Sequence, residues 1–219
     1  MREGAILRLF VFRPARSDAA FDATLREDVL PRLMDMPGIV DAFVGRHGPG
    51  SDDERVIASI WESRRAMTAG LGASSILAPY QPDQAAEVVG SRLDILGVRV
   101  AVRHERADPP VILRVFRGEA KQGQLEGYIQ EADMGANADA ESNAGLAALY
   151  LGSQPPTRFI TVSAWTSWSS IEVATGGDVR RPVATRHSER LVGADVDHYE
   201  MLPNAIRPPV RMARTGSAR

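Results

Sequence analysis

Short stretches of the chain alternate between aliphatic residues and residues of mixed character, and this two-residue period predicts β-strands. Residues 6–12 show the division clearly, because every second residue from Leu7 onward is aliphatic. The alternate positions in this stretch are Ile6, Arg8, Phe10 and Phe12. Residues 55–61 and 158–165 are divided in the same way, and each stretch ends in a tryptophan. Each predicted strand therefore has one aliphatic face and one mixed face of aromatic and polar side chains.

Two other segments repeat their apolar residues every three or four positions and predict amphipathic helices. In the first of them, Ser17 can cap the helix and Pro31 is expected to kink its last turns. The apolar stripes are Phe21, Leu25, Val29 and Leu33 in the first segment, and Leu125, Tyr128, Ile129 and Ala132 in the second. A short helix is expected after each strand that ends in tryptophan.

The order of these elements occurs twice, which predicts an internal duplication. The chain reads Ile-Leu-Arg, an aliphatic residue and Phe at residues 6–10, and again at residues 112–116. Later in the two halves, Trp61 corresponds to Trp165. Each half reads β-α-β-β-α-β, which is the ferredoxin-like plan.

The duplication predicts an α+β protein built from two ferredoxin-like repeats. We assign residues 1–106 to the first repeat, residues 107–203 to the second, and residues 204–219 to a basic, flexible tail. Last strands are expected at residues 96–104 and 191–201. The two sheets are expected to form a barrel, with their mixed faces turned toward each other around an enclosed space that can hold a small molecule.

Composition narrows the functional classes. The chain has 219 residues, and its formal charge of −2 argues against a general nucleic-acid-binding protein. It contains no cysteine, which excludes disulfides, thiolate nucleophiles and Cys-ligated metal centres. No apolar run has the length of a membrane span, so we expect no membrane partner and a cytoplasmic location. The near-neutral charge likewise leads us to expect no nucleic-acid partner.

Two repeats of this kind, with the stretch Ile-Trp-Glu-Ser at residues 60–63 and the looser Ala-Trp-Thr-Ser at residues 164–167, resemble the dimeric α+β barrel superfamily. Within it, the sequence is similar to the antibiotic-biosynthesis-monooxygenase-like proteins. The resemblance implies a tandem fusion in which one chain supplies both sheets of the barrel, as a monomer with an internal pseudo-dimer or as a homodimer. The superfamily includes cofactor-free oxygenases, haem-degrading enzymes, isomerases and proteins of no known activity.

The sequence departs from the motifs of two of these groups. Haem-degrading members have an Asn on the first strand, where this chain has Arg8 and Arg114 with their Phe neighbours, and a Trp on the short helix, near Gly70 and Ala174 here. Only His187 lies where their His is expected. The quinone-forming members have an Asn before the strand Trp and a Tyr after it. The corresponding residues are Ile57 and Met67 in the first half, and Thr161 and Ile171 in the second.

The strongest candidates for chemistry are Arg8 and Arg114, because a guanidinium beside a Phe ring can hold an anionic oxygen in two hydrogen bonds. His187 or Tyr150 is a candidate for proton transfer. The residues expected to line the ligand site are Phe10, Ser59, Trp61, Phe116, Thr161, Ser163 and Trp165. The alternative is structural: the arginines form ion pairs or reach solvent, and the tryptophans pack between sheet and helix.

The leading functional hypothesis is a small-molecule-binding α+β barrel that oxygenates an aromatic, phenolic or enolic substrate without a cofactor, and the ligand is expected to be aromatic or anionic. One alternative is a haem-binding or haem-degrading protein, and another is a non-catalytic binding or assembly module with a packed interior. No metal site is expected, because strand alternation places His198 on the opposite face from Asp195 and Asp197. If only one half is active, Tyr150, Thr161, Ser163 and His187 favour the second.

Overall fold

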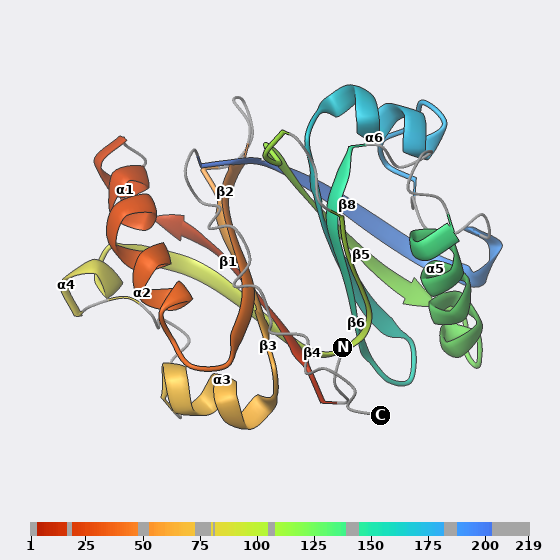
Figure 1. Cartoon of the computed structure of the whole chain (residues 1–219), viewed down its shortest axis with the longest axis horizontal. Helices are drawn as coiled ribbons and strands as arrows, with labels where there is room; N and C mark the ends of the chain where they lie inside the picture. Colours follow the sequence, from red (N-terminus) through yellow and green to blue (C-terminus); the bar gives the residue numbers. More distant parts are fainter. Residues whose placement is uncertain are drawn as a thin grey trace, which may run out of the picture.

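A computed structural model shows eight strands that form a closed barrel, with helices packed on its two outer sides (Figure 1). The structure describes residues 4–16, 19–47, 53–72, 80, 82–104, 108–138, 145–181 and 188–202. The elements of the first repeat are β1 (Ile6–Pro14), α1 (Ala19–Thr24), η1 (Leu25–Val29), α2 (Leu30–Met34), β2 (Ile39–His47), β3 (Arg55–Trp61), α3 (Arg64–Leu71), α4 (Pro82–Ala85) and β4 (Val88–Arg103). Those of the second are β5 (Ile112–Ala120), α5 (Leu125–Ala138), β6 (Leu146–Gln154), β7 (Arg158–Trp165), α6 (Trp168–Thr175), η2 (Ser188–Arg190) and β8 (Leu191–Met201).

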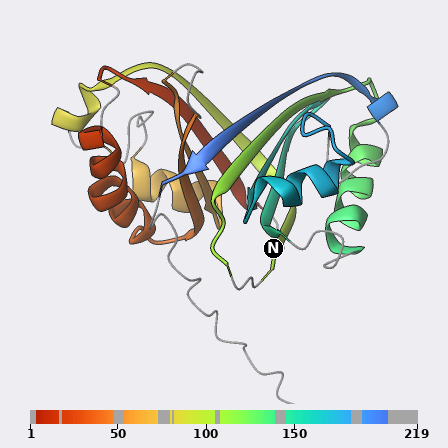
Figure 2. The ribbon, with the colours of Figure 1, turned by 90° about the horizontal axis from the view of Figure 1, so that it is seen from above.

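The strand order around the barrel is β1-β3-β2-β8-β5-β7-β6-β4, and every neighbouring pair is antiparallel. The repeats meet at two junctions, β4 with β6 and β8 with β2. Figure 2 shows β4 and β8 crossing the molecule from one repeat to the other. The α+β class and the expected barrel of two ferredoxin-like repeats are confirmed, although β4 begins eight residues before the expected strand at residue 96.

The expected orientation of the strand faces is wrong. The core cluster that draws on strands of both repeats contains the aliphatic face of β1, with Leu7, Leu9 and Val11, and the matching Leu113 and Val115 of β5. The barrel interior is therefore lined mainly by aliphatic side chains, together with Phe43, Tyr150 and Tyr199, and the mixed faces of β1 and β5 point outward to the helices. The bulkier aromatic side chains fill the wider space between a sheet and rounded helices.

Two separate layers result, one on each side of the barrel. The first helix layer lies between the first repeat's sheet and α1, η1, α2 and α3, and includes Phe10 and Trp61. The second helix layer lies between the second repeat's sheet and α5 and α6, and includes Phe116 and Trp165. Because a strand of this fold is buried on both faces, alternation alone does not reveal which face lines the barrel.

The helical stripe predicted for the first repeat is confirmed, because Phe21, Leu25, Val29 and Leu33 are all buried in the first helix layer. Pro31 changes the helix in a specific way. It has no N–H to donate, and the turn before it widens into a π-helical segment, η1, in which the Leu30 N–H bonds to the Leu25 carbonyl. Ser17, the predicted cap, lies outside the described residues.

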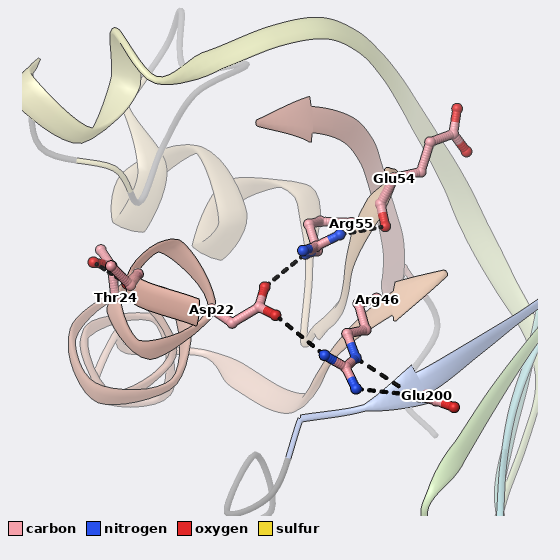
Figure 3. A network of polar contacts seen from close by, with 7 residues as sticks. Asp22, Thr24, Arg46, Glu54, Arg55 and Glu200 are labelled. Atoms are coloured by element: carbon pink, nitrogen blue, oxygen red, sulfur yellow. Dashed lines mark hydrogen bonds and ion pairs between the residues drawn. The ribbon is translucent and has the colours of Figure 1, made fainter. Parts of the chain in front are cut away.

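At one pair of equivalent positions, the contact between helix and strand is polar in the first helix layer and aromatic in the second. In the first layer, the Arg55 side chain of β3 donates from Nε to Oδ1 of Asp22 on α1 over 2.6 Å, and both residues are buried (Figure 3). Strand register places Phe159 of β7 at the position of Arg55. There the Phe159 ring packs against Tyr128 of α5, with ring centroids 4.2 Å apart. An ion pair in one repeat thus corresponds to an aromatic pair in the other.

Candidate functional site

The predicted site residues are divided between the two helix layers. The first repeat contributes Arg8, Phe10, Ser59 and Trp61, and the second contributes Arg114, Phe116, Thr161, Ser163 and Trp165. In both repeats the arginine lies directly opposite a serine of the neighbouring strand, Arg8 opposite Ser59 and Arg114 opposite Ser163. Because the layers lie on opposite sides of the barrel, Arg8 and Arg114 do not share a cavity, and the predicted two-arginine site is wrong.

Both strand tryptophans are fully buried and held by a serine of their own strand. The Trp61 Nε1–H donates to Ser59 Oγ over 3.0 Å, and the Trp165 Nε1–H donates to Ser163 Oγ over 2.9 Å. Residues two apart on a strand share a face, so the serine lies beside the indole. A Cβ at Gly70 of α3 would come within 3.1 Å of the Trp61 ring, so the absence of a side chain there lets helix and indole pack closely.

Arg114 ties a connecting segment to the sheet. Its Nε and Nη2 donate to the Val179 carbonyl over 3.3 and 3.0 Å, and Nη2 also donates to the Arg181 carbonyl. Its guanidinium lies 5.4 Å from the centroid of the Phe116 ring. Burial lowers the pKa of Arg114 to about 10, which leaves the group charged at neutral pH. Arg114 therefore holds the segment after α6 against β5.

In the first repeat, Arg8 lies beside a tyrosine that the sequence did not single out. The Arg8 guanidinium is 5.1 Å from the Phe10 ring centroid, and burial lowers its pKa to about 10. Tyr80 packs edge-on against Phe10 and Phe12, with centroid separations of 6.3 and 5.6 Å. Burial raises the pKa of Tyr80 well above its usual range, while the nearby positive charge of Arg8 opposes that rise. At neutral pH this pair is a guanidinium cation beside a neutral phenol.

The Tyr80 hydroxyl is buried and has no hydrogen-bond partner among the described residues. A phenol that has lost water and gained no partner is costly, so an oxygen atom of a bound molecule would stabilise it. Tyr80 lies in the connection between α3 and α4, outside any strand or helix. No periodic pattern includes it, which is why strand and helix analysis missed it.

Tyr150 lies on a different surface from the other predicted residues. It belongs to the barrel-interior cluster, and its hydroxyl donates to Asp41 Oδ2 over 2.8 Å. Arg103 Nη1 lies 2.9 Å from the same oxygen. Burial raises the pKa of Tyr150, and the neighbouring Asp41 charge raises it further. Tyr150 and Trp165 therefore lie on opposite faces of the sheet. His187, the other residue predicted to transfer a proton, lies outside the described residues.

His198 occupies the second helix layer. It is directly opposite Arg114 in the strand register, and its ring centroid is 4.9 Å from that of Trp168. Burial lowers the pKa of His198 to about 4, with a further contribution from Arg114, so the imidazole is neutral at pH 7. Its buried Nε2 has no hydrogen-bond partner among the described residues. Strand alternation, which separates His198 from Asp195 and Asp197, is the sequence signal for this position.

The barrel-interior cluster consists of seventeen buried side chains, contributed by both repeats. A pocket of about 620 Å³ does occur, at the end of β5, β7 and β8. Within the described ranges, no three His, Asp or Glu side chains are grouped as a metal would require. Nor does any described helix have the length and apolar character needed to cross a membrane.

No family model matches the sequence, and no curated protein is significantly similar to it. Solved structures do share the fold. A candidate monooxygenase of Lactobacillus acidophilus has a TM-score of 0.73 and 11% identity over 91% of this chain and 94% of its own. An anthrone oxidase-like protein has a TM-score of 0.59 and 12% identity, over 91% and 92% of the two chains.

Chlorite dismutase from Candidatus Nitrospira defluvii, in a mutant form, has a TM-score of 0.62 and 8% identity, over 94% of both chains. At these identities the likeness concerns the fold. Its extent, together with the closed barrel and the two crossing strands, leads to one conclusion. The chain has the fold of the dimeric α+β barrel proteins, with both halves of the barrel supplied by one polypeptide.

Proposed function

We propose that this protein is a cofactor-independent monooxygenase that acts on a phenolic or enolic aromatic molecule in the first helix layer. The observation that carries the proposal is the buried Tyr80 hydroxyl, which lacks a partner among the described residues and lies beside the Arg8 cation. The likeness in fold to an anthrone oxidase-like protein supports the substrate class.

The chemistry needs a stabilised substrate anion and dioxygen. Loss of a proton gives an enolate or phenolate, which transfers electrons to dioxygen. For anthrone, the ring CH₂ becomes a C=O: one atom of dioxygen enters the product, and the other leaves as water. This four-electron oxidation balances without another reductant or oxidant.

Arg8 and Tyr80 would stabilise the anionic oxygen in this reaction. Arg8 supplies a fixed positive charge, and the raised pKa of Tyr80 keeps its hydroxyl a hydrogen-bond donor. Aromatic surroundings lower the local dielectric and strengthen both interactions. Phe10 and Trp61 would contact the substrate rings. Because the layer is closely packed, substrate entry requires side chains around Tyr80 to move.

The arrangement favours the first repeat over the second, contrary to the expectation from sequence. The buried Tyr80 hydroxyl that lacks a partner among the described residues packs beside Phe10 and Phe12 in the first helix layer. Tyr150 lies on the interior face, so it would take no part in a site of either helix layer. A role for Ser163, Thr161 and His187 is not needed by this proposal.

Haem is not fitted by the described residues. On the short helix, a Cβ at Gly70 would lie 3.1 Å from the Trp61 ring, so this position does not accommodate a large side chain such as Trp. On the first strand, Arg8 packs against Phe10.

The second candidate function is a non-catalytic binding or assembly module, and the mostly aliphatic barrel interior, which offers few groups for chemistry, favours it. An assay of anthrone oxidation distinguishes this candidate function from the proposed monooxygenase activity. We expect the protein to consume dioxygen with anthrone and to form anthraquinone. In Tyr80→Phe and Arg8→Met, loss of one oxyanion donor should lower the turnover number by roughly 100-fold.

Tyr128→Phe, which makes the same change in the second helix layer, is the matched control and should retain wild-type turnover. Near-UV circular dichroism of each variant verifies that its packing is intact. Absence of turnover by the wild-type protein, or full turnover by folded Tyr80→Phe, would reject the proposed activity.

A further inference from the structure

The pocket at the end of the second sheet has the features of a separate binding site. Its volume of about 620 Å³ lies within the range of small-molecule sites. Its lining combines four charged residues, Arg117, Glu119, Arg158 and Asp195, with uncharged residues that include Phe159, Val192 and Ala194. Gly193, which also lines the pocket, has open space beside it, because a Cβ there would meet no atom within 4 Å.

Arg117 has an unused pair of donors. Its Nη1 is hydrogen-bonded to Asp197, and Nε and Nη2 make no hydrogen bond of ordinary geometry in the described part of the chain. The buried Tyr199 hydroxyl lies close enough for the Arg117 charge to oppose the rise in the pKa of Tyr199, so a ligand would compete with this phenol. Nε and Nη2 form one edge of the guanidinium, the geometry that binds both oxygens of a carboxylate. Both nitrogens are shielded from solvent, so a carboxylate in the pocket would meet them after a rotation of the Arg117 side chain, whose exposed fraction is 13%.

The charges around the pocket select against a simple anion. Arg117 is paired with Asp197, and Arg158 is paired with Asp94 of β4 over 2.5 Å. Arg92 also lies near Asp94, at 3.8 Å. With Glu119 and Asp195 added, these three arginines face four carboxylates, which leaves a net charge of −1. A bare carboxylate would meet this acidic surplus, whereas a bare cation would leave the Arg117 edge without an acceptor.

The first repeat lacks this arrangement. By strand register, the position of Arg117 is held there by Val11, and the position of Asp195 is held by Arg92. The acidic surplus and the free guanidinium edge are therefore properties of the second repeat alone, and a Val is compatible with the fold at this position.

We propose that this pocket binds a small amino acid that carries a carboxylate and a cationic side chain. The carboxylate accepts from Nε and Nη2 of Arg117, and the ammonium groups lie near Asp195 and Glu119. The site is on the inner face of the second sheet, and it is distinct from the first helix layer, where the oxygenation is proposed.

Isothermal titration calorimetry with three matched probes tests this site. L-Lysine carries both kinds of group, cadaverine is lysine without the carboxylate, and hexanoate has the carboxylate alone. We expect L-lysine to bind at least tenfold more tightly than either of the others. Arg117→Val, which restores the residue of the first repeat, should weaken lysine binding by roughly tenfold or more and leave cadaverine binding unchanged.

Further variants distinguish a binding defect from a folding defect. Arg117→Lys keeps a positive charge for Asp197 but lacks the two-donor edge, so it should also weaken lysine binding while the protein stays folded. Asp195→Asn should weaken both lysine and cadaverine. Arg99→Gln, which does not line the pocket, should change neither. No lysine binding at millimolar concentration, equal binding of lysine and cadaverine, or unchanged binding by both Arg117 variants would overturn the proposal.

Discussion

A buried carboxylate joins the two repeats inside the barrel. Asp41 of β2 accepts hydrogen bonds from the Tyr150 hydroxyl of β6 and from the backbone N–H of Ala42, and lies 2.9 Å from Arg103 of β4. Burial raises the pKa of Asp41, whereas Arg103 and Tyr150 partly oppose the rise. The folded protein therefore holds a proton on Asp41 more tightly than the unfolded chain does.

This raised pKa fixes the sign of a pH effect. As the pH rises above about 3.8, Asp41 ionises in the unfolded chain while the folded protein still holds the proton, so its contribution to the free energy of unfolding falls until the folded-state pKa is passed. Asp41→Asn lacks this ionisation. The free energy of unfolding of the variant minus that of the wild type should therefore increase with pH, by at most about 1.4 kcal/mol per pH unit.

Urea unfolding at several pH values between 4 and 7 measures this difference. Asp53→Asn, which removes a charge at an exposed position, is the control for the loss of one negative charge. If the free energy of unfolding of Asp41→Asn minus that of the wild type decreased as the pH rises, the partners of ionised Asp41 would stabilise it by more than burial destabilises it.

Equivalent positions in the two repeats illustrate how residues compensate for one another. Asp22 and Arg55 bury an ion pair, and Tyr128 and Phe159 bury an aromatic pair in the corresponding place. Buried ion pairs and well-packed apolar groups of similar size are often close in stability, so both solutions are compatible with the same fold. The sequence shows the four residue types, but not that each helix residue faces its strand partner.

At the scale of elements, glycines set how closely the short helices approach the sheets. A Cβ at Gly145, just before β6, would overlap the Ser170 side chain of α6, and a Cβ at Gly38 would overlap Ala66 of α3. We expect Gly145→Ala to force α6 outward and to lower the free energy of unfolding by about 1–3 kcal/mol. Urea denaturation measures the loss.

A double-mutant cycle with Ser170→Gly tests the cause. Removal of the Ser170 side chain should make Gly145→Ala less destabilising than it is in the wild-type background. Gly97→Ala in β4 is the matched control, because no atom lies within 4 Å of its Cβ. Equal losses at the two glycines, or no coupling with Ser170, would contradict the packing argument.

The period of each element is a local property, and the sequence was sufficient to predict it. Alternation in residues 6–12 and the stripe from Phe21 to Leu33 both predicted correct elements. The partner of each face depends on the whole fold. Arg8 and Leu7 are both almost completely buried, Arg8 against the helices and Leu7 inside the barrel. The hydrophobic pattern of the sequence therefore did not show which of the two faces lines the barrel. Tyr80 and Arg117 became candidates only when distant segments were placed together.

At the scale of the whole molecule, the barrel is closed by two unequal junctions between the repeats. The β4–β6 junction extends over six register pairs from Gly97 to Arg103. In the described strands, the β2–β8 junction has three, formed by Gly45–His47 with Tyr199–Met201. One further backbone hydrogen bond, from the Leu202 N–H to the Val44 carbonyl, extends the shorter junction.

Arg46 reinforces the shorter junction from its outer side. Its Nε and Nη2 lie 3.3 and 3.1 Å from Glu200 Oε2, and its Nη1 lies 3.7 Å from Asp22 Oδ2 (Figure 3). Arg46 is about half exposed, and an ion pair of this kind contributes about 0.5 kcal/mol, or less in salt. The contact connects α1 through β2 to β8 but adds little strength.

Local opening of the barrel should therefore begin at β2–β8, because fewer hydrogen bonds must break there. In hydrogen-exchange mass spectrometry, peptides that contain residues 45–47 and 199–201 should exchange before those that contain residues 97–103. Arg46→Gln should speed exchange at the first two by about twofold and leave the third unchanged, because only the shorter junction loses a contact. Earlier exchange at residues 97–103 would place the weak point at β4–β6, and the number of paired residues would then not determine where the barrel opens.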